Sequence, residues 1–311
     1  IDDLIKTVRK NQDGCWINDN YVGIIVYADD IVLLSPSLDG LQNMINSCSD
    51  YARNHNLAFS TDDDPKKSKT KCMVFQKIKR DPRKLELNGK DLPWVNAIKH
   101  LGSTITNDVD CITKQDLIEK RAIYVSRNNE LCQEFFFAHH RTKIWINNVY
   151  NTSFYSSPLW DITSKHYTKL EKSWNVSQRI MMNLPRTTHR FFIEPLTKTQ
   201  HIGKSLKKRF VNFVCKVKES EKCVLRHMLY EIEKDCRSTT GKNIRALLLE
   251  YNEIKLSEID IQSIAYKEIP KGDEWKISLV NEIIETTSGD LEVIEFTNDQ
   301  LKEISELACI N

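Results

Sequence analysis

The amino-acid sequence predicts an α+β fold, in which an antiparallel sheet with a packed helix precedes a mainly α-helical region. Short runs of β-branched and aromatic residues, separated by turn residues, occur up to about residue 110. From residue 114 onward, apolar residues instead recur at three- and four-residue spacing. The charge is segregated as well, because residues 120–220 carry 18 Lys/Arg against 6 Asp/Glu and the regions on either side are net acidic. We therefore expect three regions, 1–110, 111–220 and 221–311.

A hairpin is predicted at residues 21–35, "YVGIIVYADDIVLLS". Both arms are rich in β-branched and aromatic residues, and the interval Ala28-Asp29-Asp30 is expected to form the turn. Asp is common in turns for conformational reasons, so one interpretation is an ordinary solvated turn. The other interpretation is chemical. Two carboxylates at the end of a hairpin are oxygen ligands of the kind that Mg²⁺ prefers, although a two-metal site needs a further carboxylate from a neighbouring strand.

The residues after this hairpin carry further helix and strand signals. A helix is expected after Pro36, with Ser35 or Ser37 as its cap and an apolar stripe that faces the sheet. A polar loop with three acids followed by four lysines then leads to a strand at 72–75. Two short hairpins are expected next, one turning at Asn88-Gly89 and one around Gly102.

Helices are predicted over residues 114–138, 139–155, 165–184 and 200–255. Aromatic residues concentrate in this region at Phe135, Phe136, Phe137, Trp145, Tyr150, Phe154, Tyr155 and Trp160. We expect most of them to lie in the core, with Tyr155 or Trp160 as candidates for stacking on nucleotides. The basic block 120–220 is either a surface for a polyanion such as nucleic acid or a solvated face without a specific ligand.

The composition argues against several classes of protein. No apolar stretch approaches the roughly 18 residues of a membrane span and no leader of the secretory type is evident, so we expect an intracellular location, nucleus or cytoplasm, without a membrane partner. Nine cysteines occur without a CxxC pair or a Cys/His ligand frame. They are interpreted as reduced, mostly buried thiols rather than zinc ligands. The opening "IDDLIKTV" begins with Ile, and the chain is therefore interpreted as a fragment.

Several segments resemble the reverse transcriptases of non-LTR retrotransposons, from the latter part of the palm through the thumb. The segment "YADDIVLLSPS" resembles the family's signature hairpin, "LAFSTDDDPKKSKTKCMVF" the strand and lysine-bearing loop after the palm helix, and "LPWVNAIKHLGSTIT" the primer-grip hairpin. The segments "NELCQEFFFAHHRTK" and "SFYSSPLWD" resemble the helical region after the palm. The resemblance covers roughly residues 1–200, and the combination of the YADD hairpin with the primer grip is its most specific part.

This resemblance implies an RNA-directed DNA polymerase, which transfers nucleotides from dNTPs to a DNA primer on an RNA template with two Mg²⁺ ions. Residues 1–110 would be part of the palm, 111–220 a basic thumb-like region, and 221–311 an acidic region without an assigned role. Asp29 would be a ligand of both metal ions and Asp30 a supporting ligand. Lys69 is the candidate general acid for the pyrophosphate leaving group, with Lys67 and Lys71 as competitors.

Contacts with nucleic acid are implied at three places. At the hairpin tip, Tyr27 would pack below the primer terminus and Ala28 would leave room beside it. A primer grip would be formed by His100, Leu101 and Gly102, where glycine lets the backbone approach the primer strand. Phosphate contacts from the thumb would come from Arg121, Arg127, Arg141, Lys143, Arg179 and Arg186.

The chain also departs from the family's pattern. The family's first catalytic Asp, its fingers and its nucleotide-selecting helix would lie upstream of Ile1, so the two-metal site is incomplete and we expect the isolated chain to be inactive. At "FYSSPLW" the family more often carries Gly at the position of Ser156 or Ser157. An alternative hypothesis is a non-enzymatic retroelement remnant that binds nucleic acid through its basic helical region.

Overall fold

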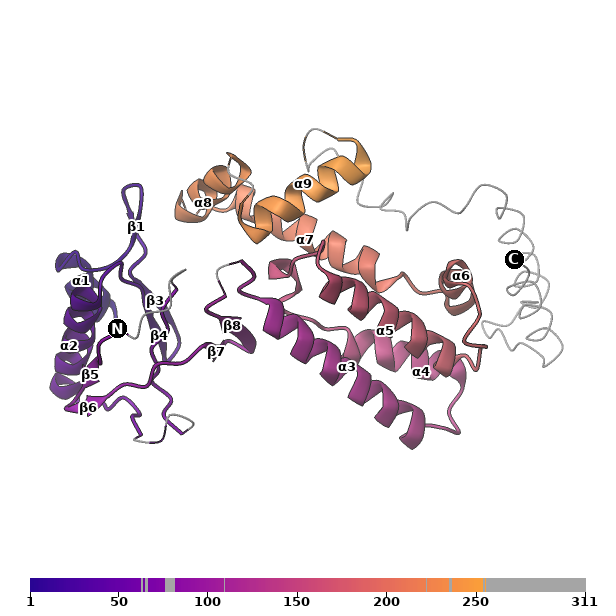
Figure 1. Cartoon of the computed structure of the whole chain (residues 1–311), viewed down its shortest axis with the longest axis horizontal. Helices are drawn as coiled ribbons and strands as arrows, with labels where there is room; N and C mark the ends of the chain where they lie inside the picture. Colours follow the sequence, from indigo (N-terminus) through magenta and orange to yellow (C-terminus); the bar gives the residue numbers. More distant parts are fainter. Residues whose placement is uncertain are drawn as a thin grey trace. The chain divides into compact units, whose positions relative to one another are not determined.

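The structure is a computed structural model that describes residues 1–62, 64, 67–75, 82–108, 110–221, 223–234, 237–253 and 255. These residues form two compact units, whose elements are labelled in Figure 1. The first unit consists of Ile1–Ile112 with Ser220–Glu231, and the second of Thr113–Glu219 with the described residues from Ile232 onward. Most of the predicted acidic region 221–311 lies outside the described residues.

The first unit begins with two helices that pack on each other and on the hairpin around the YADD sequence (Figure 1). Its elements in order are α1 (Asp2–Lys10), β1 (Trp16–Ile17), β2 (Asn20–Tyr21), β3 (Ile24–Tyr27), β4 (Asp30–Leu33) and α2 (Leu38–Asn54). Ser37 caps α2 as predicted, since its hydroxyl oxygen accepts a hydrogen bond from the Gly40 N–H. Leu4, Val8 and Met44 form the buried cluster that joins the two helices to the hairpin.

Two further hairpins of the first unit turn where the sequence predicts. They are β5 (Glu86–Leu87) with β6 (Lys90–Asp91), and β7 (Ala97–His100) with β8 (Ser103–Thr106). Both two-residue turns have positive φ at each position, namely 55° and 74° at Asn88-Gly89 and 46° and 77° at Leu101-Gly102. This is the type I′ geometry, which matches the twist of the flanking strands. Positive φ costs conformational free energy at Leu101, because a bulky side chain disfavours this region.

The pairing of strands confirms the α+β class and corrects one predicted strand. Within the described residues the strands form four separate two-stranded antiparallel sheets. Residues 72–75 are not a strand. Only Cys72 makes a β-bridge, to Trp94, with hydrogen bonds of 2.9 Å from the Cys72 N–H to the Pro93 carbonyl and from the Val95 N–H to the Cys72 carbonyl. The prediction failed because a short apolar run shows which residues are buried but not whether a partner strand lies beside them.

The second unit is helical, as predicted. Its α-helices are α3 (Lys114–Glu134), α4 (His140–Ile146), α5 (Lys165–Met181), α6 (Ile193–Thr197), α7 (Ile202–Glu219), α8 (Cys223–Lys234, shared with the first unit) and α9 (Thr239–Tyr251). The predicted helix 139–155 is α-helical only to Ile146 and continues as the π-helical turn η1 (Asn147–Asn151). The predicted helix 200–255 is divided into three helices, α7, α8 and α9. The apolar periodicity of the sequence did not reveal the two interruptions between them.

A buried carboxylate joins three parts of the second unit. Asp116 in the first turn of α3 is 1% exposed, and it accepts hydrogen bonds from the Ser156 hydroxyl at 2.5 Å and from the Trp160 indole N–H at 2.7 Å. The Trp160 carbonyl in turn accepts a 2.7 Å hydrogen bond from Asn243 of α9, whose own side-chain oxygen accepts from the Ile162 N–H. This chain of hydrogen bonds holds Trp160, which is fully buried, in the larger apolar core cluster.

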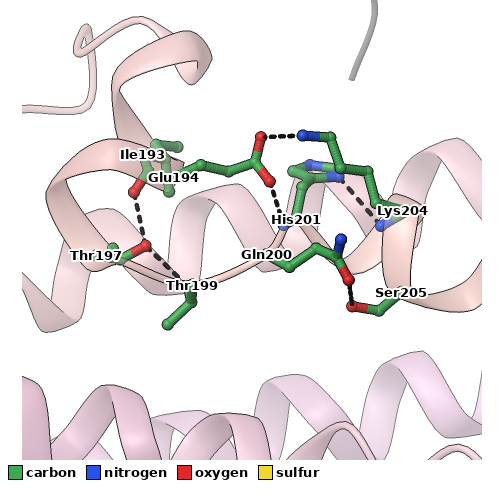
Figure 2. Close-up of polar contacts among 9 residues, drawn as sticks. Ile193, Glu194, Thr197, Thr199, Gln200, His201, Lys204 and Ser205 are labelled. Atoms are coloured by element: carbon green, nitrogen blue, oxygen red, sulfur yellow. Dashed lines mark hydrogen bonds and ion pairs between the residues drawn. The ribbon is translucent and has the colours of Figure 1, made fainter. Parts of the chain in front are cut away.

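A second polar cluster joins α6 to the start of α7 (Figure 2). Glu194 of α6 accepts a 2.7 Å hydrogen bond from the His201 N–H and pairs with Lys204 at 2.9 Å. The imidazole of His201 is 1% exposed, and its Nδ1 accepts from the Gly203 N–H. Burial is the main cause that lowers the pKa of His201 to about 3, and the nearby cations of Lys204, Arg190 and Lys207 contribute to the same shift. His201 is therefore a neutral side chain at physiological pH.

The two adjacent serines at 156 and 157 are expected to differ in their effect on stability. Ser156→Ala removes a donor from the buried Asp116 carboxylate and should lower the free energy of unfolding by about 1–3 kcal/mol. Ser157→Ala is the matched control, because the Ser157 hydroxyl is equally buried and has no hydrogen-bond partner among the described residues. Removing that hydroxyl should be neutral or slightly stabilising. Urea unfolding followed by tryptophan fluorescence measures both changes, and equal losses would contradict the assigned role of Ser156.

The buried imidazole of His201 should make stability depend on pH below about 6.5. In that range the unfolded chain binds a proton on this residue that the folded chain does not, so the free energy of unfolding falls as pH is lowered toward 3. The slope approaches about 1.4 kcal/mol per pH unit once the pH lies well below 6.5. His201→Asn keeps an acceptor for the Gly203 N–H but does not titrate, so its unfolding free energy should change less between pH 6.5 and 5. A variant slope as steep as that of the wild type would contradict this assignment.

Candidate functional site

The tip of the β3–β4 hairpin holds the four residues of the YADD sequence. Tyr27 pairs with Asp30, so the turn contains only Ala28 and Asp29 and is one residue shorter than expected. Ala28 has a φ of 53°, in the left-handed region. Strand alternation separates the two faces of the hairpin, because Ile31 packs against the cluster under the helices while Tyr27 is 64% exposed. Asp29 and Asp30 are both exposed at the tip.

The structure brings the predicted primer grip next to this tip. The Nδ1 atom of His100, at the end of β7, lies 3.9 Å from a carboxylate oxygen of Asp30, which is the distance of an ion pair when the imidazole is protonated. The His100 side chain is 24% exposed and that of Asp30 is 57% exposed, so the contact is accessible to solvent. His100 directly precedes the turn at Leu101-Gly102 and Asp30 directly follows the turn at Ala28-Asp29, so this contact brings together two turns that are far apart in sequence.

The three lysines considered as general acids lie in the loop before Cys72. Lys67 and Lys69 are exposed, whereas Ser68 between them is buried and its hydroxyl donates to the Thr70 carbonyl. Thr70 is held to Ser60 by a backbone hydrogen bond and by its own hydroxyl. None of Lys67, Lys69 and Lys71 contacts the YADD carboxylates within the part of the chain that the structure describes. Their assignment stays a prediction.

The hairpin tip offers only two candidate ligands for a metal ion. Asp29 and Asp30 offer oxygen atoms of the type that Mg²⁺ prefers. Among the described residues, however, no group of three or more His, Cys, Asp or Glu side chains is placed to hold a metal ion. The two carboxylates are thus a partial ligand set, and further ligands would have to come from other residues.

Three of the six predicted phosphate-binding residues make hydrogen bonds within the second unit. Arg121 of α3 donates from Nε to the Ser173 hydroxyl at 2.8 Å. Arg179 of α5 donates from Nε and Nη2 to the Thr188 carbonyl at 2.8 and 2.7 Å, and burial lowers the pKa of its guanidinium group. Lys143 is 8% exposed and donates to the Phe136 carbonyl. These contacts give the three residues structural roles, and their assignment as phosphate contacts stays a prediction.

The other three predicted cations are more accessible. Arg127 on α3 and Arg186 after α5 are exposed, and Arg141 on α4 is partly exposed. They are the members of the predicted set whose side chains are placed to meet a ligand from solvent.

A group of lysines that was not selected from the sequence lies near His166, with Lys165 and Lys169 at the start of α5 and Lys114 at the start of α3. Burial lowers the pKa of His166, and the neighbouring cations Lys169, Lys114, Lys165 and Arg121 lower it further. The three lysines of this group are exposed, as is Lys172 one turn farther along α5. The sequence signal was the spacing of 165, 169 and 172, which places three lysines on one face of a helix. Only one acid, Glu171, lies on the same helix.

The aromatic segment of the second unit differs from its prediction. Phe154 and Trp160 are buried in the core as expected. Six others are exposed: Phe135, Phe136, Phe137, Trp145, Tyr150 and Tyr155. Trp160 is fully buried and binds Asp116, which excludes it as a stacking platform, whereas Tyr155 is 80% exposed.

The described cysteines are free as predicted, but most of them are not buried: only Cys48 and Cys72 are buried, and the other four are partly exposed. Cys15, Cys48, Cys72, Cys111, Cys132 and Cys215 are all free thiols. Burial raises the pKa of Cys48 and that of Cys72 to about 11, so both are unreactive at neutral pH. Within the described ranges, no helix combines the length and the apolar character that crossing a membrane requires.

Comparisons with protein-family models, with curated proteins and with solved structures gave no match to this chain.

Proposed function

We propose that this chain is part of an RNA-directed DNA polymerase of the non-LTR retrotransposon class, which adds nucleotides from dNTPs to a DNA primer on an RNA template. The observation that carries the proposal is the position of His100. It lies 3.9 Å from Asp30, so the hairpin that resembles the primer grip meets the hairpin that carries the YADD sequence. A polymerase needs this arrangement, because the primer terminus must be held where the nucleotide is transferred.

The YADD hairpin would hold the metal ions, and the β7–β8 hairpin would position the primer. Asp29 and Asp30 would supply oxygen ligands for Mg²⁺, the cofactor implied by phosphoryl transfer. The inner face of β3–β4 packs against α1 and α2, which fixes the position of the tip. Tyr27 and Ile25 leave the outer face of the hairpin apolar and exposed, where a primer terminus could pack.

A second candidate function is non-enzymatic nucleic-acid binding by a retroelement remnant. The partial metal ligand set is compatible with this alternative. The lysines on the exposed face of α5 supply the positive charge that binding to phosphates requires. The two candidates share the basic helical surface and differ only at the YADD hairpin.

Cross-linking should distinguish the two candidates. A primer annealed to an RNA template and carrying 4-thiothymidine at its 3′ end is expected to cross-link to peptides that contain residues 27–30 and 100–102, because these two turns lie together. Mass spectrometry of the digested product identifies the sites. Primer extension by the 311-residue chain, with Mg²⁺ and dNTPs, is expected not to exceed that of Asp29→Asn, because the described residues hold only part of a metal ligand set.

A primer of the same sequence that carries the 4-thiothymidine at its 5′ end serves as the control for this experiment. Cross-links that stay the same when the reactive base moves to the 5′ end would contradict placement of the primer terminus at the hairpins. Such a result would favour the non-enzymatic function.

Duplex binding should depend steeply on salt and on the lysines of α5. Each phosphate contact contributes about −0.9 to the slope of log K against log salt for B-DNA. The double variant Lys169→Gln/Lys172→Gln should therefore weaken binding at low salt and make the slope shallower by up to about 2. Fluorescence anisotropy with a labelled duplex at several salt concentrations measures both quantities.

Lys10→Gln is the matched control, since Lys10 is an exposed helical lysine of the first unit. The control should leave the slope unchanged. An unchanged slope in the α5 variant, or no binding by the wild type at low salt, would argue against a phosphate-binding face on α5.

A further inference from the structure

The second unit exposes six aromatic rings within one stretch of the chain. They belong to Phe135, Phe136, Phe137, Trp145, Tyr150 and Tyr155, and we call them the aromatic surface. Five of them have more than 60% of their area exposed: Tyr155 at 80%, Phe136 at 76%, Phe137 at 75%, Tyr150 at 62% and Trp145 at 61%. Single exposed apolar residues are ordinary, but several large rings in one segment mark a binding surface.

The first part of this surface is held against α4. Phe136 and Phe137 make an edge-to-face contact with ring centroids 5.6 Å apart, and Phe135 lies 6.4 Å from Phe137. The buried ammonium group of Lys143 donates to the Phe136 carbonyl at 3.3 Å, which fixes the backbone of this segment to the helix. The three rings are thus exposed, while their backbone is held to α4 by this hydrogen bond.

The second part of the surface lies on the helix itself. Trp145 is in the last turn of α4, and Tyr150 follows in the π-helical turn η1. Their rings meet nearly perpendicularly, with centroids 6.4 Å apart. Phe137 lies in the turn before α4, whereas Trp145 lies in the last turn of that helix. The surface can therefore offer two separate platforms to one extended ligand.

The charge around these rings identifies the kind of ligand. Between Phe135 and Trp160 the sequence contains no Asp or Glu, while Arg141 lies one turn before Trp145 on the same face of α4. His139 and His140 lie between the phenylalanines and Arg141. A ligand that suits this surface combines flat rings with negative charge. Aromatic side chains near cations in a region without acids are the features with which proteins bind single strands of nucleic acid.

We propose that the aromatic surface binds single-stranded nucleic acid, with bases stacked on the rings of Phe136, Phe137 and Trp145 and with phosphates near Arg141. The proposal rests on the proposed function for the choice of nucleic acid as the polyanion, and it adds a site for the unpaired strand. Stacking tolerates any base, because every base has a π face, so the site is expected to have little sequence preference.

The experiment compares two oligonucleotides that differ only in their bases. Binding of the full chain to a fluorescent 20-nucleotide thymidine strand is measured by anisotropy beside binding to an abasic strand of the same length. The abasic strand has the same phosphates but nothing to stack. The wild type should bind the thymidine strand at least tenfold more tightly, and Trp145→Ala or Phe136→Ala should each reduce that preference by about fivefold or more.

Two further variants make the comparison specific. Trp145→Phe retains a ring and should keep most of the preference, whereas Trp145→Leu retains apolar area without a ring and should lose it. Phe213→Ala is the matched control, because Phe213 is an exposed aromatic residue of α7 outside the aromatic surface. All substituted side chains are exposed, so circular dichroism and thermal unfolding should match the wild type.

The outcomes separate this proposal from its rivals. Equal binding of the two strands by the wild type, or full retention of the preference in Trp145→Leu, would overturn base stacking. Self-association detected by sedimentation and abolished by Trp145→Ala would instead show a contact between copies of the chain, which would also overturn it. Failure of the proposed function is seen separately, as absent cross-links of a duplex primer terminus at residues 27–30 and 100–102.

Discussion

The second unit depends on the hydrogen bonds that the buried side chain of Asp116 accepts. Its carboxyl group lies in the core, where a polar group without a partner would cost about 1–3 kcal/mol, and donors from Ser156 and Trp160 compensate for the lost water. Because the Trp160 carbonyl also binds Asn243, this one group connects the first turn of α3, the segment around residue 157 and α9. The outer faces of α3, α4 and α5 can carry lysines and exposed rings because the core behind them is fixed by a few specific contacts.

The local parts of the fold were predictable because they depend on local chemistry. Asn88-Gly89 predicts a two-residue turn since both residues tolerate positive φ, and the structure has that turn. Ser37 was one of two candidate caps, and the hydrogen bond from the Gly40 N–H identifies it as the cap. The YADD turn was predicted as well, although Asp30 belongs to the strand rather than to the turn. In each case the residues that determine the local structure are adjacent in the sequence.

The features that depend on distant parts of the chain could not be predicted. Helical periodicity showed which residues are apolar, but not which faces lack a partner, so Phe136 and Trp145 were expected in the core and are exposed. Arg179 was selected for its charge, yet it binds the Thr188 carbonyl across a turn that no spacing rule predicts. Nothing in the sequence pairs Asp116 with Ser156 either. The contact of His100 with Asp30 likewise depends on how two hairpins pack.

The π-helical turn at Asn147–Asn151 explains why Trp145 and Tyr150 touch. Residues five apart in an α-helix point in directions about 140° apart, whereas the wider turn of a π-helix brings them nearly above one another. The contact is therefore set by the number of residues in the turn as well as by their identity. Regular α-helical winding of these same residues would rotate the two rings onto different sides of the helix, whereas loss of one residue between them would place them about 40° apart, on the same side. The number of residues in this turn therefore affects the aromatic surface, and a comparison of side chains alone would overlook it.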